Sequence, residues 1–165
     1  MTLPTVAGVA SLVVSAMEMH SRVEEVQARG CALLKTLAWG RRTPSQLYDA
    51  GAVIVIVEAI RTHPRSIGVV GEACKALENL CRDADELGGL CTQQACRADL
   101  LRLLLQVLRG GKMGPLVPLN LVHELYHNDP GVTDPERPGA LDFEELKRLQ
   151  LWYSKIVRVP DKGHL

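Results

Sequence analysis

The chain has 165 residues, enough for one domain with a buried core. Its 19 Lys and Arg residues balance its 19 Asp and Glu residues, so a nucleic-acid partner held mainly through phosphates is not expected. The composition is 47% apolar but 4% aromatic, which predicts a core of Ala, Leu and Val, and no apolar run approaches the ~18 residues of a membrane span.

The N-terminal region is apolar but has no basic segment, so it does not fit a secretory signal peptide. Residues 8–19 instead predict a helix that is apolar on nearly every side, as buried helices are. His20-Ser21 breaks the chain, and residues 22–38 then show the apolar spacing of a second helix.

Three more helices are predicted in the next stretch. Thr43 suits an N-cap and Pro44 a first helical position, which predicts a short helix ending near residue 50. Residues 51–62 and 66–82 predict two longer helices, separated at His63-Pro64 because Pro64 cannot continue a helix. The β-branched run in 51–62 fits a strand when taken alone, but its register with 8–19 favours a helix.

That register is an internal repeat, in which residues 7–39 align with 50–82 without a gap. A period of about 40–47 residues is typical of helical arrays whose units stack on their neighbours. A third unit follows at a spacing wider by two residues, with 95–108 over 50–63 and 118–126 over 73–81. Ten of the 33 pairs are identical: Ala7/Ala50, Gly8/Gly51, Val14/Val57, Ala16/Ala59, His20/His63, Arg22/Arg65, Val26/Val69, Cys31/Cys74, Leu34/Leu77 and Leu37/Leu80.

The three-part unit, a short helix before two longer ones, resembles the armadillo repeat. QLYDAGAVIVIVEAI resembles its short helix followed by "aGaIplLvelL", and EACKALENLC resembles its "aawaLsNLa" helix. The His-Pro break and the Val-Gln…Gly-Cys…Leu…Leu pattern resemble armadillo segments in the N-terminal regions of large leucine-rich-repeat kinases. The resemblance implies an all-α, armadillo-like right-handed α-solenoid across residues 1–127, with about three repeats at about 7–49, 50–94 and 95–127.

The pattern stops after the third unit. Residues 128–141 are rich in proline and predict a loop. Asp142, with Glu145 three residues on, predicts the cap of an amphipathic helix at 142–157. Residues 158–165 are expected to form a frayed tail.

The resemblance also implies a non-catalytic scaffold, because armadillo repeats hold extended peptides along a row of third helices. We expect Trp39 to anchor a partner, since Trp and Arg dominate binding hot spots, and Asn79 to bind peptide backbone through its amide. The alternative is that Trp39 packs on the connector at 41–47. The Trp/Asn ladder of nuclear-import receptors is absent, so basic localisation signals are not the expected cargo. The expected partner-binding residues are Thr36, Trp39, Lys75, Asn79, Arg82, Asn120 and Glu124.

One motif offers an enzymatic alternative. His123-Glu124-Leu125-Tyr126-His127 is H-E-x-x-H, which on a helix can bind zinc and supply a general base, as in zinc metallopeptidases. The third ligand would have to come from downstream. However, the repeat register places His123 over Glu78 and Glu124 over Asn79, at polar positions, which favours two surface histidines. The available downstream acids are Asp134, Asp142, Glu144 and Glu145.

A second motif, at 134–145, resembles a calcium loop of the EF-hand family. Pro138 removes the side-chain ligand of position 5, and the sequence has no second loop to pair with it. A capped helix after a Pro-rich loop explains the segment as well. We therefore expect no catalytic residue, no metal and no cofactor.

The cysteines indicate a reducing, cytoplasmic location. They form no C-x-x-C pair, their number is odd, and Cys31 and Cys74 share one repeat position, which predicts buried free thiols. Cys91 and Cys96 are expected in a connector. The full set is Cys31, Cys74, Cys81, Cys91 and Cys96.

The first repeat has no polar cap over Leu12, Val13 and Val14. Because uncapped ends of helical arrays expose apolar surface, we expect this end to pack against further repeats or another subunit.

Overall fold

The computed structural model describes residues 5–40, 43–82, 86–110 and 116–128, with residues 148 and 151. These residues form helices and no strand, which confirms the all-α class. The chain divides into unit 1, Met1–Asp129, and unit 2, Pro130–Leu165. The Pro-rich loop beyond Asn128, the calcium-loop motif, the tail and nearly all of the helix expected at 142–157 lie outside the described residues.

The first repeat contains α1 (Val6–Met19) and α2 (Glu24–Leu37), within two residues of the predicted bounds. Thr5 caps α1 by accepting a hydrogen bond from the Gly8 amide at 3.1 Å. The buried side chain of Gln27 donates to the carbonyls of Met17 and His20, at 2.9 and 3.0 Å. Gln27 thereby fixes the C-terminal end of α1 against α2, because it satisfies carbonyls that the helix leaves unpaired.

The first repeat, bounded at residue 49, ends with the short helix α3 (Thr43–Asp49), and the second contains α4 (Ala52–Thr62) and α5 (Ile67–Cys81). The short helix is confirmed, and so is the helical prediction for the β-branched run in α4. Gly51, at φ 80°, makes the left-handed turn between α3 and α4. Ser66 caps α5 by accepting from the Val69 amide at 3.2 Å.

The third repeat differs from the sequence prediction. The connector expected around Cys91 and Cys96 is a helix, α6 (Glu86–Arg97), and the repeat boundary expected at 94/95 falls inside it. Asp99, at φ 59°, then makes the left-handed turn that Gly51 makes before α4. Consequently α7 (Leu100–Arg109) begins five residues later than the predicted segment at 95–108. The last described helix of the unit, α8 (Leu119–Asn128), agrees with the prediction at 118–126.

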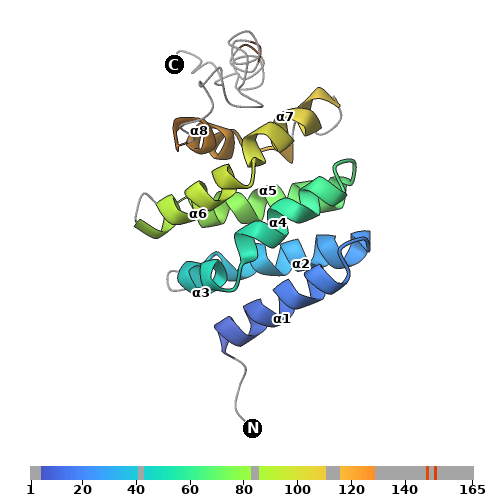
Figure 1. The fold of residues 1–165 in the computed structure, drawn as a ribbon, viewed down its shortest axis with the longest axis vertical. Helices are drawn as coiled ribbons and strands as arrows, with labels where there is room; N and C mark the ends of the chain where they lie inside the picture. Colours follow the sequence, from blue (N-terminus) through green and yellow to red (C-terminus); the bar gives the residue numbers. More distant parts are fainter. Residues whose placement is uncertain are drawn as a thin grey trace, which may run out of the picture. The chain divides into compact units, whose positions relative to one another are not determined.

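Six of the described helices of unit 1 lie in two rows (Figure 1). One row runs from α2 to α5 to α8, and the other from α1 to α4 to α7, with consecutive members in contact. The short helix α3 contacts both α4 and α6. Each helix of a repeat therefore lies next to its counterpart in the following repeat.

Hydrogen bonds between equivalent turns reinforce this arrangement. His63 Nε2 lies 2.8 Å from the Ser21 carbonyl, and Ser66 Oγ donates to Glu24 Oε1 at 2.6 Å. Both bonds join residues that are 42 apart in sequence, close to the repeat spacing. The turn between α4 and α5 thus stacks on the turn between α1 and α2.

Close packing between α1 and α2 depends on a glycine. A Cβ atom at Gly30 would lie 2.4 Å from Met17 Sδ and 2.5 Å from Met17 Cγ, far inside normal contact. Met17 is 1% exposed, so the surrounding core leaves it little room to move.

Gly30→Ala is therefore expected to lower the free energy of unfolding by about 1–3 kcal/mol, the usual range for overpacking a core. Gly89→Ala is the matched control within α6, because a Cβ there meets nothing within 4 Å. We expect Gly89→Ala to raise stability by about 0.5–1 kcal/mol through helix propensity. Urea unfolding followed by circular dichroism measures both, and a neutral Gly30→Ala would contradict the close packing.

Candidate functional site

Trp39 lies just beyond the end of α2 and is 73% exposed, so it does not bury itself on the connector that follows. The guanidinium carbon of Arg82, which caps the C-terminus of α5, lies 5.7 Å from the centre of the Trp39 ring. This is a cation–π contact between two successive repeats. It combines an exposed aromatic face with a positive charge.

Asn79, one turn before Arg82, is half-buried and already engaged with α2. Its amide nitrogen donates to the Lys35 carbonyl at 3.2 Å, so it joins the backbones of neighbouring second helices. Thr36 is exposed, and its hydroxyl donates to the Ala32 carbonyl within α2 at 2.9 Å. Both side chains therefore make hydrogen bonds within the protein, and both belong to the row of α2, α5 and α8.

A hollow of about 190 Å³ lies between α5 and α8. It brings together Arg82, Asn120 and Glu124, three of the residues expected to bind a partner. Lys75 is exposed on α5 but does not line this hollow. The complete lining is Glu78, Cys81, Arg82, Asn120, Leu121, His123 and Glu124.

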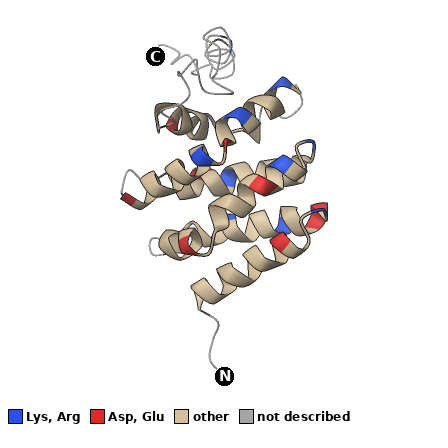
Figure 2. Cartoon of the chain, in the orientation of Figure 1, with Lys and Arg blue, Asp and Glu red and all other residues tan. Residues whose placement is uncertain are grey.

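Four residues that line the hollow were not among the expected partner-binding residues: Glu78, Cys81, Leu121 and His123. Their positions in the sequence could have indicated them. Glu78 lies one helical turn before Arg82, and Leu121 and His123 are adjacent to the expected residues Asn120 and Glu124. The lining carries two carboxylates and one guanidinium together with amide and imidazole groups. Charges of both signs are scattered over the helices of unit 1 (Figure 2).

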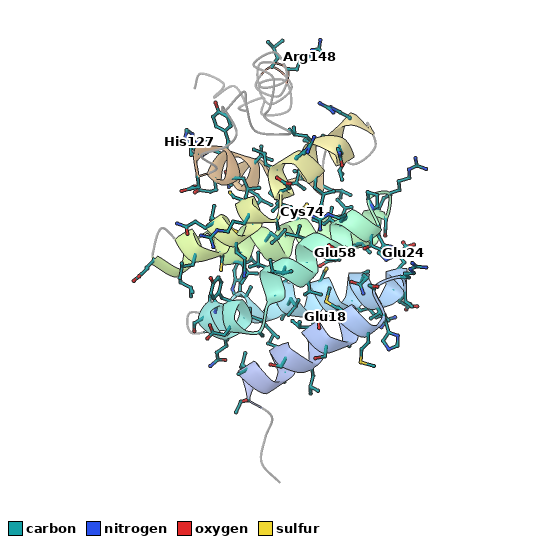
Figure 3. The ribbon with its side chains drawn as sticks, in the orientation of Figure 1. Glu18, Glu24, Glu58, Cys74, His127 and Arg148 are labelled. Atoms are coloured by element: carbon teal, nitrogen blue, oxygen red, sulfur yellow. The ribbon has the colours of Figure 1, made fainter. Side chains whose placement is uncertain are left out.

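The two histidines of the H-E-x-x-H motif lie one turn apart on α8, and both are exposed. Their Nε2 atoms are 3.0 Å apart, in a hydrogen bond between the rings, and Figure 3 shows His127 at the outer side of α8. The Glu124 carbonyl accepts from Asn128 at 2.8 Å. Among the residues that the structure describes, no group of three His, Cys, Asp or Glu side chains could hold a metal ion.

All five cysteines are buried free thiols. Burial raises the pKa of Cys31, Cys74 and Cys81 to about 12 in each case. Figure 3 shows Cys74 in the middle of the stacked helices. Because the thiolate is the reactive form, these thiols are suited to packing rather than chemistry.

The chain is 28% identical over 110 residues to Protein aardvark of Dictyostelium discoideum, a match that covers 60% of this chain and 14% of that protein. The chain therefore spans about a seventh of the length of this relative. No protein-family model and no solved structure matches it. Among the described helices, none is both long and apolar enough to cross a membrane.

Raising the pH above about 9 is expected to destabilise the fold. The pKa of each of these buried thiols is about 12, whereas the ordinary pKa of a thiol is 9.0, so the unfolded chain releases the thiol protons first. Between these values the unfolded state binds fewer protons, and the free energy of unfolding falls with rising pH; below pH 9 the contribution is complete. Urea midpoints at pH 8 and pH 10 test this, with Cys74→Ala expected to lose less than the parent. Equal midpoints would contradict it.

His123→Ala and His127→Ala are each expected to change the free energy of unfolding by no more than about 0.5 kcal/mol, because both side chains are exposed. Leu125→Ala, on the same turn, is the control and should cost about 2–5 kcal/mol because Leu125 is fully buried. Metal content of protein purified without a metal-affinity tag is measured alongside. One equivalent of zinc that either histidine variant loses would contradict the prediction.

Proposed function

We propose that this chain is a non-catalytic scaffold for protein–protein interaction, built as an armadillo-like right-handed α-solenoid of about three repeats. In this proposal, an extended partner segment binds along the row of α2, α5 and α8. The stacking of these helices supports the proposal, because one peptide can contact the C-terminal turns of successive helices. The 43-residue repeat supports it as well, because such repeats form extended binding surfaces.

The observation that carries the proposal is the contact between Trp39 and Arg82. A large aromatic ring that is 73% exposed offers its face at a junction between repeats, beside a guanidinium and a polar hollow. Isolated exposed apolar residues are common, but an exposed Trp–Arg pair next to a hollow is the composition of a binding hot spot.

The groups around the pair match an extended peptide. The amide of Asn120 is exposed on α8, and Asn79 retains its second N–H and its carbonyl oxygen; both amides suit peptide backbone. Arg82 is available to a carboxylate, while Glu78 and Glu124 are available to basic side chains. A partner segment with charges of both signs and one apolar side chain over Trp39 fits this surface best.

We further infer a reducing, cytoplasmic location. Five buried thiols without a disulfide are stable where cellular reductants keep cysteines reduced.

Selection of a random peptide library on the immobilised chain, followed by fluorescence polarisation of an enriched peptide, tests the proposal. Trp39→Ala and Arg82→Ala are each expected to weaken binding by about 10- to 30-fold, as hot-spot truncations do. Asn79→Ala should weaken it less, since Asn79 also bonds to α2. The helical circular dichroism signal should be retained in all three.

Gln106→Ala is the control, because Gln106 is exposed on α7, in the other helix row. Its binding should equal that of the parent. If all three row variants bind normally, the row is not the binding site.

A further inference from the structure

The end of unit 1 formed by α1 and α2 exposes apolar side chains that the next repeat buries. Leu12 is 70% exposed and Leu33 is 52% exposed, whereas their counterparts Val55 and Ala76 are 6% and 0% exposed. Val14, which the sequence had placed on this open end, is 6% exposed and belongs to the core. The exposed apolar surface therefore includes fewer residues than the sequence predicted, and it is limited to particular positions of α1 and α2.

The aligned repeats show what covers those positions. Both repeats have helices after them, but in unit 1 only the second has described helices before it. A position that is less buried in the first repeat than in the second thus belongs to the face that lies against a preceding repeat. We call this set the N-terminal face; it includes Val9, Leu12, Val13 and Ala16 of α1 and Val26, Leu33 and Leu37 of α2.

On each of the two helices, the spacing of these positions places them in one stripe along the helix surface. Figure 2 shows α1 almost without charged residues, and Glu18 is its one charged side chain. The residues of α4 that align with the four α1 positions of the N-terminal face are all buried: Ala52, Val55, Ile56 and Ala59. The N-terminal face thus has the character of a repeat junction that is open.

Its charge, however, is reversed relative to the internal junction. There, Glu72 of α5 forms a half-buried ion pair with Lys35 of α2. In the first repeat, the position of Glu72 is taken by Arg29, which is exposed and pairs with Glu25 on its own helix at 2.7 Å. A preceding repeat that packs on the first repeat as the first packs on the second would need an acidic side chain at the position equivalent to Lys35. That side chain would pair with Arg29.

This requirement separates a repeat with an acidic side chain at that position from a second copy of the chain. The third repeat has His123 at the position of Lys35, so it offers an imidazole to Arg29 instead of a carboxylate. We propose that the N-terminal face binds a helical repeat that is not part of residues 1–165 and that carries Asp or Glu at the position equivalent to Lys35. The proposal is independent of the Trp39–Arg82 surface, and either can fail without the other.

A tethered repeat tests this, because tethering makes the docking contact intramolecular. A second copy of residues 7–49 is inserted before residue 7, once with Lys35 and once with Lys35→Glu in the added copy. The original copy carries Leu12→Cys, which is labelled with a maleimide. We expect the added copy to slow labelling by at least about tenfold, and Lys35→Glu to slow it by a further factor of about two to five.

Met19→Cys is the matched control. Met19 is 77% exposed and its counterpart Thr62 is exposed too, so its labelling should be the same in every chain. With Arg29→Glu in the original copy, the charge preference should reverse, and the added copy with Lys35 should protect Leu12→Cys better.

Equal labelling of Leu12→Cys with and without the added copy would overturn the proposal. An added copy that lowers the unfolding midpoint, or a charge preference that does not depend on Arg29, would overturn it as well. So would concentration-dependent dimerisation of the unmodified chain that Leu12→Glu abolishes, because the face would then bind a second copy.

Discussion

The packing of α5 between α2 and α8 is the contact on which the rest of unit 1 depends. Nine of the 15 residues of α5 are buried, more than one helix face can supply, so the helix needs neighbours on both sides. Small residues permit close approach, as where a Cβ on Gly68 would lie 3.7 Å from Ala28 Cβ. The α4–α5 pair thus buries its apolar residues against helices on both sides, as expected where repeats stack on their neighbours.

The same stacking determines where function can lie. Side chains used to pack α5 against its neighbours are unavailable to a partner, which leaves the C-terminal turns and the outer positions. Stacking brings those turns together, so Trp39 and Arg82 meet although they lie in different repeats. The described thiols are buried and the two histidines of α8 are exposed, whereas the row offers aromatic, amide and charged groups.

The sequence predicted the helices of the first two repeats because their apolar spacing is regular and the 43-residue register resolves local ambiguity. It failed at α6, where Gly88-Gly89 and scattered polar residues weaken the helical pattern. It also misplaced the start of α7, because Asp99 makes a left-handed turn, a conformation that residues other than glycine rarely adopt.

The sequence placed the candidate residues on α2, α5 and α8, but it did not indicate the contacts that they make within the protein. Asn79 was expected to be free for a partner, yet one of its N–H groups bonds to the backbone of α2. The hollow beside Arg82 arises from the separation of α5 and α8 at their surfaces, which no periodic pattern encodes. Gln27 is likewise a residue that the sequence alone would place at the surface. Its side chain is buried because it donates hydrogen bonds to two backbone carbonyls.

The most direct test of the account is the mapping of a bound peptide by amide chemical shifts in the labelled chain. The account predicts that the largest shifts fall on residues 36–39, 79–82 and 120–124, at the ends of α2 and α5 and along α8. Shifts concentrated on α1, α4 and α7, with α2, α5 and α8 unaffected, would contradict it.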